Sequence, residues 1–211
     1  MKYKNAQEAF ENMYKIISEE GLIHGETKCL FNVGFYMLQP EDNIIKTKWR
    51  KFKPDYAEEE WQWYLSGNTN AMKIAEKAKI WYKCMDEFGN VNSNYGAHWN
   101  EGDQIEYVVN ELKNNNESRR ASISIYNAKK RHNFKNDTPC TYAINFCIIK
   151  NELCMSVLMR SNDLWYGFAN DQYCFSKLQK MIADKLNINV GWYYHFTNNM
   201  HLYFNFLNKK Q

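Results

Sequence analysis

The chain has 211 residues, 45% of them hydrophobic and 16% aromatic, and 27 Lys and Arg against 24 Asp and Glu give a formal charge of +3. This length and apolar content fit a single domain over residues 1–211 and exclude a disordered chain. The slight, scattered positive charge argues against nucleic-acid binding, so the anion to expect is small, such as one phosphate.

The sequence carries no obvious membrane or export segment. A run of about 18 apolar residues, as a membrane span requires, is absent, and residues 1–20 carry acids throughout, unlike a signal peptide. The 6 cysteines form no CxxC pair and match neither a zinc site nor a compact disulfide framework. We therefore expect a cytoplasmic protein with free thiols and no metal site.

Three segments open the chain. Apolar side chains at helical spacing predict a helix over residues 5–20, which Gly21 would end in a left-handed conformation. Residues 29–38 are apolar and aromatic without a helical period, so they predict a buried strand. A basic loop follows over residues 46–54.

The middle of the chain predicts three helices. They are expected over residues 57–67, 72–88 and 103–113, with a turn-rich stretch at 89–96 before the last of them. The third is amphipathic, and Asp103 is a candidate cap for its N-terminus.

The second half of the chain predicts mainly strands. A hairpin is indicated by the polar residues 150–152 between two apolar runs, and one helix is expected over residues 172–186. The strands are expected over residues 121–126, 140–149, 153–160, 190–196 and 201–206. Helices mixed with strands that cluster late in the chain predict an α+β fold with a mixed or mostly antiparallel sheet.

Few positions are diagnostic by themselves. Arginine forks and a serine hydroxyl are good phosphate ligands, which makes candidates of Arg119 and Arg120 and of the pair Arg160 and Ser161. Composition alone favours solvated basic turns at both places. Cys140 begins an apolar strand and would by itself be taken for a small core residue.

Two further sets of residues have side chains suited to a functional site, but their sequence patterns are not specific for one. Asp163 and Asp171 bracket a loop that contains Gly167, where ordinary turn chemistry is the alternative. His201 and Tyr203 alternate on one face of a predicted strand. Neither set identifies a site alone.

The order of short blocks along the chain is far more specific than any one block. From residue 60 onward the chain reads, in order, EWQWYLSGNTN at 60–70, IW at 80–81, NYG at 94–96, DQI at 103–105, SRR at 118–120, PCT at 139–141, RSND at 160–163, Gly167, Asp171 and HLY at 201–203. This ordered set resembles the thymidylate synthase family from about residue 57 to residue 205.

The resemblance implies the thymidylate synthase-like fold, a homodimer formed through the sheet, and methylene-tetrahydrofolate as the co-substrate. It implies one-carbon transfer to carbon 5 of a pyrimidine nucleoside monophosphate, with nearby arginines favouring a thiolate nucleophile. The residues implied are, for catalysis, Cys140, Glu60, Tyr95 and Asp171; for the phosphate, Arg160 and Ser161 with Arg119 and Arg120 from the second subunit; for the sugar, His201 and Tyr203; and for folate, Trp81 and Asp163.

Three positions differ from the residues usual in thymidylate synthases, and all three differences resemble the same group of relatives. Thr141 and Met159 stand where the synthases usually have His and Gln, and Asp171 stands where an Asn reads uracil. These departures resemble the deoxycytidylate hydroxymethylases, because a protonated carboxyl group can accept from the amino group of cytosine and donate to its ring nitrogen. Asn170 precedes Asp171, so an alignment shifted by one place stays open.

The product and the sugar are left open by the sequence. The leading hypothesis is 5-hydroxymethylation of dCMP; the alternatives are CMP as in nucleoside antibiotic pathways, methylation of dCMP or dUMP, and an inactive nucleotide-binding relative. Only eight residues follow Tyr203, so closure over folate is expected to differ from the family's. In the N-terminal phosphate loop, where the family carries an Arg, only Lys28 is found.

Overall fold

In the computed structural model, which describes residues 1–209, eight strands form one sheet in the order β1-β3-β8-β6-β5-β4, with β2 paired to β3 and β7 to β8. The strands are β1 (Lys2–Tyr3), β2 (Leu22–His24), β3 (Thr27–Met37), β4 (Ser122–Ser124), β5 (Thr141–Ile149), β6 (Glu152–Met159), β7 (Asn162–Asp163) and β8 (Asn189–Tyr203). Antiparallel β3–β8 and β5–β6 pairs combine with a parallel β6–β8 pair. The predicted α+β fold with a mixed sheet is confirmed.

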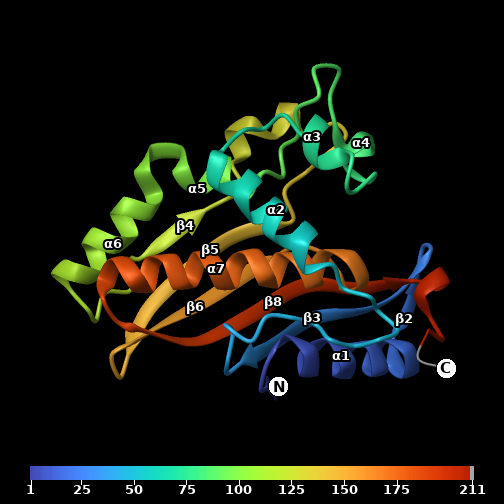
Figure 1. Ribbon diagram of the computed structural model, residues 1–211, viewed down its shortest axis with the longest axis horizontal. Helices are drawn as coiled ribbons and strands as arrows, with labels where there is room; N and C mark the ends of the chain where they lie inside the picture. The colour runs from blue at the N-terminus through green and yellow to red at the C-terminus, as the bar shows by residue number, and fades with distance from the viewer. Residues whose placement is uncertain (210–211) are drawn as a thin grey trace.

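Helices pack against this sheet, with α1 and α7 lying along it and α2 and α5 beyond α7 (Figure 1). The α-helices are α1 (Ala6–Glu20), α2 (Pro54–Ser66), α3 (Met72–Ala75), α4 (Trp81–Cys84), α5 (Tyr95–Asn100), α6 (Gln104–Asn114) and α7 (Ala169–Leu186). Short helical turns are η1 (Glu101–Asp103), η2 (Ala128–Asn133), η3 (Leu164–Phe168) and η4 (Phe204–Phe206). No helix within residues 1–209 is long and apolar enough to cross a membrane.

The first helix forms as its pattern predicts, but its end is different. The Asn5 side chain caps α1 by accepting from the Glu8 backbone N–H at 3.0 Å, and Phe10 is among the side chains of its buried stripe. The left-handed stop at Gly21 is wrong, since this residue is extended with φ −64° and ψ 140°. Glycine is needed there for another reason: an added Cβ would lie 2.4 Å from the Ile17 carbonyl oxygen.

The single helix expected over residues 72–88 is wrong. The segment instead forms two single-turn helices, α3 and α4. Their apolar side chains pack into a separate small core that contains Ile74 and Trp81. Asp86 ends the helical path because its side chain accepts from the Phe88 and Asn90 backbone N–H groups. Such local side-chain bonds compete with helix continuation.

Asp103 does not cap α6 as expected. Its φ is +55° and its side chain makes no capping bond, whereas Gln104 donates to the His98 carbonyl at 2.8 Å and accepts from the Ser124 N–H at 2.8 Å. Gln104 therefore ties the helix start to α5 and β4, while Val108 and its neighbours on the predicted stripe are buried.

The last two strands of the sequence-based prediction are one. The polar run 197–199 predicts a break, yet β8 is continuous from Asn189 to Tyr203. β3 pairs with it on both sides of that run, from Tyr193 to Tyr203. The backbone partners that β3 supplies outweigh the local turn tendency.

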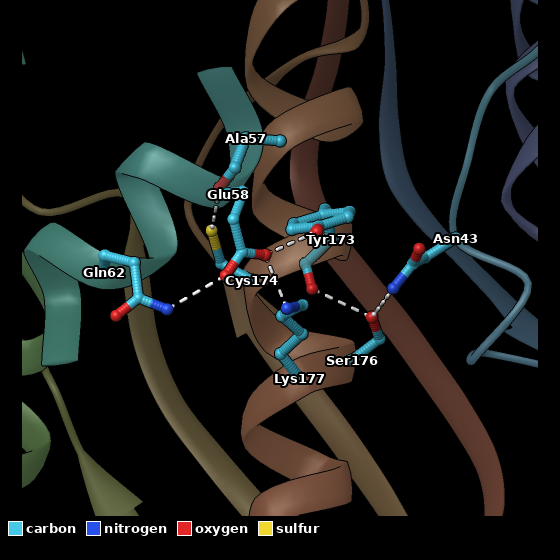
Figure 2. Close-up of polar contacts among 8 residues, drawn as sticks. All are labelled: Asn43, Ala57, Glu58, Gln62, Tyr173, Cys174, Ser176 and Lys177. Carbon is cyan, nitrogen blue, oxygen red and sulfur yellow. Dashed lines mark hydrogen bonds and ion pairs between the residues drawn. The ribbon is translucent and has the colours of Figure 1, made fainter. Parts of the chain in front are cut away.

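Helix α2 is fastened to α7 by a polar cluster around Glu58 (Figure 2). Its carboxylate accepts from Gln62 at 2.9 Å and Tyr173 at 2.7 Å and forms an ion pair with Lys177. Burial opposes ionisation, but these hydrogen bonds outweigh it and lower the pKa of Glu58 to about 2. The cluster holds in place the helix that carries Glu60.

Replacing Glu58 with Gln is expected to lower the melting temperature at neutral pH. Because the folded-state pKa is depressed, this stabilisation is present above the ordinary value of 4.5 and disappears as the pH falls toward 2. The side chain is 39% exposed, so solvent screening limits the effect to about 1 kcal/mol. Thermal unfolding of wild type and Glu58→Gln at pH 7 and pH 3 measures it, with the exposed Glu59→Gln as the matched control. An equal loss at both pH values would contradict the prediction.

Candidate active site

The β5–β6 hairpin brings Cys140 and Arg160 together at its open end. Arg160 N–H donates to the Cys140 carbonyl at 2.7 Å. Its guanidinium group donates to the Pro139 carbonyl at 3.1 Å and to the Thr138 carbonyl at 2.8 Å. Arg160 therefore holds the backbone of the residues that precede Cys140. Ser161, which is partly exposed, follows Arg160 in the sequence.

Burial and a nearby positive charge act in opposite directions on the pKa of the Cys140 thiol. Burial raises the pKa of its thiol, the Arg160 charge lowers it, and the outcome is about 11. The predicted effect of Arg160 is present, since its charge favours the thiolate, but within the single chain it does not offset the loss of water around the sulfur.

Asp137 is a positioning residue that the sequence analysis missed. Its carboxylate accepts from the Asn92 N–H at 2.8 Å, the Ser93 N–H at 2.7 Å and the Ser93 hydroxyl at 2.6 Å. The Asn92 side chain in turn donates to the Asp137 carbonyl at 2.9 Å. These bonds tie the segment before Cys140 to the start of α5, which carries Tyr95. No local pattern marks this pairing, because the partners lie more than 40 residues apart.

Glu60 and Asp171 are buried acids contributed by α2 and α7, with exposures of 4% and 9%. The Tyr64 hydroxyl donates to Glu60 at 2.9 Å, and Tyr56 also hydrogen-bonds to it. Burial raises the pKa of both carboxyl groups, and the Glu60 charge raises that of Asp171 further. The pair is therefore suited to hold and move protons.

Tyr95 lies between the cysteine and the acids. Gly96, next in the chain, packs so closely on α2 that an added Cβ would meet the Tyr64 carbonyl oxygen at 1.6 Å. The Tyr95 ring stacks on Phe175 with centroids 5.4 Å apart. Burial raises its pKa, and the charges of Asp171 and Cys140 add to that effect, which places the phenol near both.

The short strand β7 brings Asp163 beside the end of β8. Asp163 pairs in register with His201, and its carboxylate accepts from the Trp165 N–H at 2.8 Å. Burial raises the pKa of Asp163 to about 6. His201 is half-buried, and its Nδ1 lies 3.1 Å from Asn199 Oδ1. The Tyr203 ring packs edge-on against the His201 ring, with centroids 5.5 Å apart.

The predicted base-reading residue and its neighbour face different ways. Asn170 donates to the Tyr166 carbonyl at 3.1 Å on the exposed side of the turn. Asp171 lies inside, where it accepts from Asn162 at 2.7 Å. The structure thus buries the Asp171 side chain and leaves that of Asn170 outside the core.

The chain matches a known protein family. The model of the thymidylate synthase family matches residues 26–211. The chain belongs to the thymidylate synthase family. Members of this family transfer a one-carbon unit from methylene-tetrahydrofolate to pyrimidine nucleotides, so the chain is a member of a family of folate-dependent one-carbon transferases.

The two residues expected at a folate site have different surroundings. Trp81 donates its indole N–H to the Tyr56 hydroxyl at 2.9 Å and packs on Trp63 with ring centroids 5.0 Å apart, and at 9% exposure it belongs to a small core. Exposed Ile80 and Tyr82 flank it. Asp163 keeps a carboxylate that can accept from a pterin N–H.

Arg50 is a second residue that the sequence analysis missed. It belongs to the predicted basic loop, but it is only 9% exposed and donates to the Trp165 carbonyl at 2.6 Å. Its guanidinium group lies over the Trp165 ring at 5.4 Å and lowers the pKa of Asp163 against the effect of burial. Arg50 thereby supports the turn between Asp163 and Asp171.

Other predicted residues are not brought to this site within one chain. Arg119 and Arg120 are exposed and adjoin Ala121, whose carbonyl accepts from Phe146. Phe146 lies six positions along the chain from Cys140, roughly 20 Å along a strand. Lys28 donates to the Ser18 carbonyl at 2.7 Å and so is directed toward α1.

Residues that follow β8 pack against η3 and α1. Phe206 stacks on Trp165 with centroids 4.7 Å apart, and its carbonyl accepts from Tyr14 at 2.9 Å. Among residues 1–209, no group of three or more His, Cys, Asp or Glu side chains is placed to hold a metal ion.

The Asp163→Asn variant is expected to melt at a higher temperature than wild type at pH 7. The folded-state pKa of about 6 lies above the ordinary 3.8, so ionised Asp163 destabilises the fold, and this cost appears as the pH rises from about 4 to 6. Asn keeps the oxygen that accepts from Trp165, and we expect a gain on the order of 1–3 kcal/mol. Calorimetry at pH 7 and pH 4 tests the sign: the gain should shrink at pH 4, and a gain of equal size there would refute the assignment.

Proposed function

We propose that this protein is a cytidylate 5-hydroxymethylase that converts dCMP or CMP to the 5-hydroxymethyl nucleotide with methylene-tetrahydrofolate and water. The observation that carries the proposal is Asp171, a carboxyl group at the base-reading position whose pKa burial raises well above its ordinary value. A neutral carboxyl group matches the ring acceptor and amino donor of cytosine. Uracil presents the opposite pattern, and a mismatch there costs about 1–3 kcal/mol.

The phosphate and sugar contacts follow from the same geometry. Arg160 and Ser161 are proposed to bind the phosphate, and His201 and Tyr203 to meet the sugar hydroxyl. Arg160 has its Nε and one Nη occupied by carbonyls of the loop before Cys140, so its remaining N–H groups are available to an anion.

The reaction proposed starts with Cys140. Its sulfur, once ionised, adds to ring carbon 6 and makes carbon 5 nucleophilic. Folate supplies the one-carbon unit at the oxidation level of formaldehyde. Asp171 shares a proton with the base as electron density rises in the ring, and Arg160 together with Arg119 and Arg120 of the second subunit would stabilise the Cys140 thiolate by their positive charge.

Water is proposed to complete the product on the folate side of the ring. Glu60 and Tyr95 are the groups that hold it and take its proton. Thr141 supports this step, because its buried hydroxyl lies beside Cys140 and close to Tyr95. A small hydroxyl in place of the histidine ring usual in synthases leaves room for water.

A homodimer formed through the sheet completes the proposal. Tyr36 lies on the sheet face opposite α1 and α7, packed on Trp192 at 5.2 Å and Tyr194 at 4.7 Å, and all three rings are only half-buried. A second copy stacked on this aromatic face would bury it. Arg119 and Arg120, remote from Cys140 of their own chain, would then bind the phosphate across the interface.

The test is a competition among CMP, dCMP, UMP and dUMP with methylene-tetrahydrofolate, read by mass spectrometry. We expect a cytidylate to gain the mass of CH2O and labelled water to appear in the product. A gain of CH2, with dihydrofolate formed, would mean methylation, and turnover of dUMP alone would refute the role of Asp171. Binding without turnover would mean an inactive relative.

A further inference from the structure

The carboxyl group of Asp171 has a buried partner that no part of the proposed function uses. Asn162, on β7 and 3% exposed, donates from Nδ2 to Asp171 Oδ2 at 2.7 Å. The other atom of that amide, Asn162 Oδ1, is buried and has no hydrogen-bond partner within the described chain. Burying an amide oxygen without a hydrogen-bond partner costs free energy of folding. Such an atom in a native structure therefore calls for a functional explanation.

The backbone is shaped around this pair. A Cβ added to Gly167 would lie 3.0 Å from Asn162 Nδ2 and 3.3 Å from Asp171 Oδ2. The turn after Asp163 therefore passes close to both side chains and limits their freedom to rotate. Glycine at position 167 permits this approach.

The direction of the hydrogen bond has a chemical consequence. A neutral carboxyl group has one O–H and one carbonyl oxygen, and an amide N–H bonds best to the carbonyl oxygen. Since Asn162 occupies Oδ2, the proton of neutral Asp171 belongs on Oδ1. Asp171 then offers a donor at Oδ1 and, on the second lone pair of Oδ2, an acceptor.

We infer that Asn162 is the positioning residue that makes Asp171 select cytosine, by fixing which carboxyl oxygen carries the proton. This inference rests on the proposed function. Oδ1–H donates to the ring nitrogen of cytosine, and Oδ2 accepts from its amino group. Without Asn162 the proton can sit on either oxygen, and the same carboxyl group can match cytosine or uracil.

The first experiment removes the donor. Asn162→Leu keeps the approximate size of the side chain, and Asn170→Leu is the matched control, since Asn170 bonds to the Tyr166 carbonyl and not to Asp171. Binding of dCMP, CMP, dUMP and UMP is measured by calorimetry without folate. We expect Asn162→Leu to reduce the cytidylate-to-uridylate affinity ratio on the order of tenfold, the equivalent of one hydrogen bond, while Asn170→Leu keeps the wild-type ratio.

The second experiment reverses the bond and covers the case in which Asn162→Leu does not fold. In the exchange Asn162→Asp with Asp171→Asn, the amide at 171 donates to the carboxylate at 162 and turns its oxygen to the ring nitrogen, the pattern that uracil needs. In Asp171→Asn alone, Asn162 can turn its amide over, so either orientation is available. The double variant should therefore prefer uridylate more strongly than Asp171→Asn alone.

These experiments distinguish a failure of the proposed function from a failure of the role of Asn162. A wild-type protein that does not prefer cytidylates defeats the proposed function. A wild-type preference that Asn162→Leu leaves unchanged, or a double variant no more selective than Asp171→Asn, overturns the role of Asn162 and leaves the proposed function standing.

Discussion

Cys140→Ser is expected to lower kcat by at least about a thousandfold, since it removes the proposed nucleophile and a serine hydroxyl is a far weaker nucleophile at neutral pH. Serine is close in size and Cys140 is only half-buried, so the fold and nucleotide affinity should be preserved. Turnover under saturating nucleotide and folate measures the loss.

Controls for this variant come from the chain itself. Cys147→Ser changes another half-buried cysteine, on β5 away from Arg160, and should keep wild-type turnover. A denaturation-resistant protein–nucleotide adduct, detected as added mass on the wild-type protein, should be absent from Cys140→Ser. Turnover by Cys140→Ser within tenfold of wild type would remove the covalent mechanism.

Glu60→Gln is expected to lower kcat on the order of a hundred- to ten-thousandfold with little change in KM, because it removes a buried proton carrier from the water-adding step. Glutamine keeps an oxygen that can accept from Tyr64, so the hydrogen-bonded site should persist. Steady-state kinetics give the split between kcat and KM, and melting temperature checks the fold.

The neighbouring acid provides the matched comparison. Glu59 lies on the same helix, is 47% exposed and pairs only with Lys77 at 3.5 Å, so Glu59→Gln should leave kcat unchanged. Mass added to wild type from nucleotide should also form on Glu60→Gln, because attack by Cys140 precedes the step that needs this carboxyl group. A Glu60→Gln enzyme with wild-type kcat would assign the water to Thr141 and Tyr95 alone.

Features encoded within a few residues could be predicted from the sequence. The polar residues between β5 and β6 predict the hairpin, and Lys150 and Asn151 indeed adopt the left-handed φ values of 52° and 62° that such a two-residue turn requires. The stripe of α1 follows from spacing in the same way, whereas α7 begins at Ala169, three residues before the predicted start, and includes Asp171 in its first turn. Periodicity failed where a small local core mimicked a long helix, over residues 72–88.

In the candidate site, too, some residues could be predicted from the sequence and others could not. The ordered blocks name the residues that carry chemistry, because a family's nucleophile and ligands keep their order in the chain. The supports of those residues have no such signature: Asp137 acts on backbone N–H groups 44 and 45 residues away, and Arg50 on a carbonyl 115 residues away. Their partners exist only after the chain has folded.

The sequence by itself determined the class of fold, the β5–β6 hairpin and the candidates for the reactive side chains. Only the tertiary structure decided that β8 is one strand, that burial raises the pKa of the Cys140 thiol, and that Asp171 is a buried acid that accepts from Asn162. The physical reason is the same in each case: hydrogen-bond partners and loss of water are set by residues distant in the chain, and these fix both strand continuity and the pKa of a buried group.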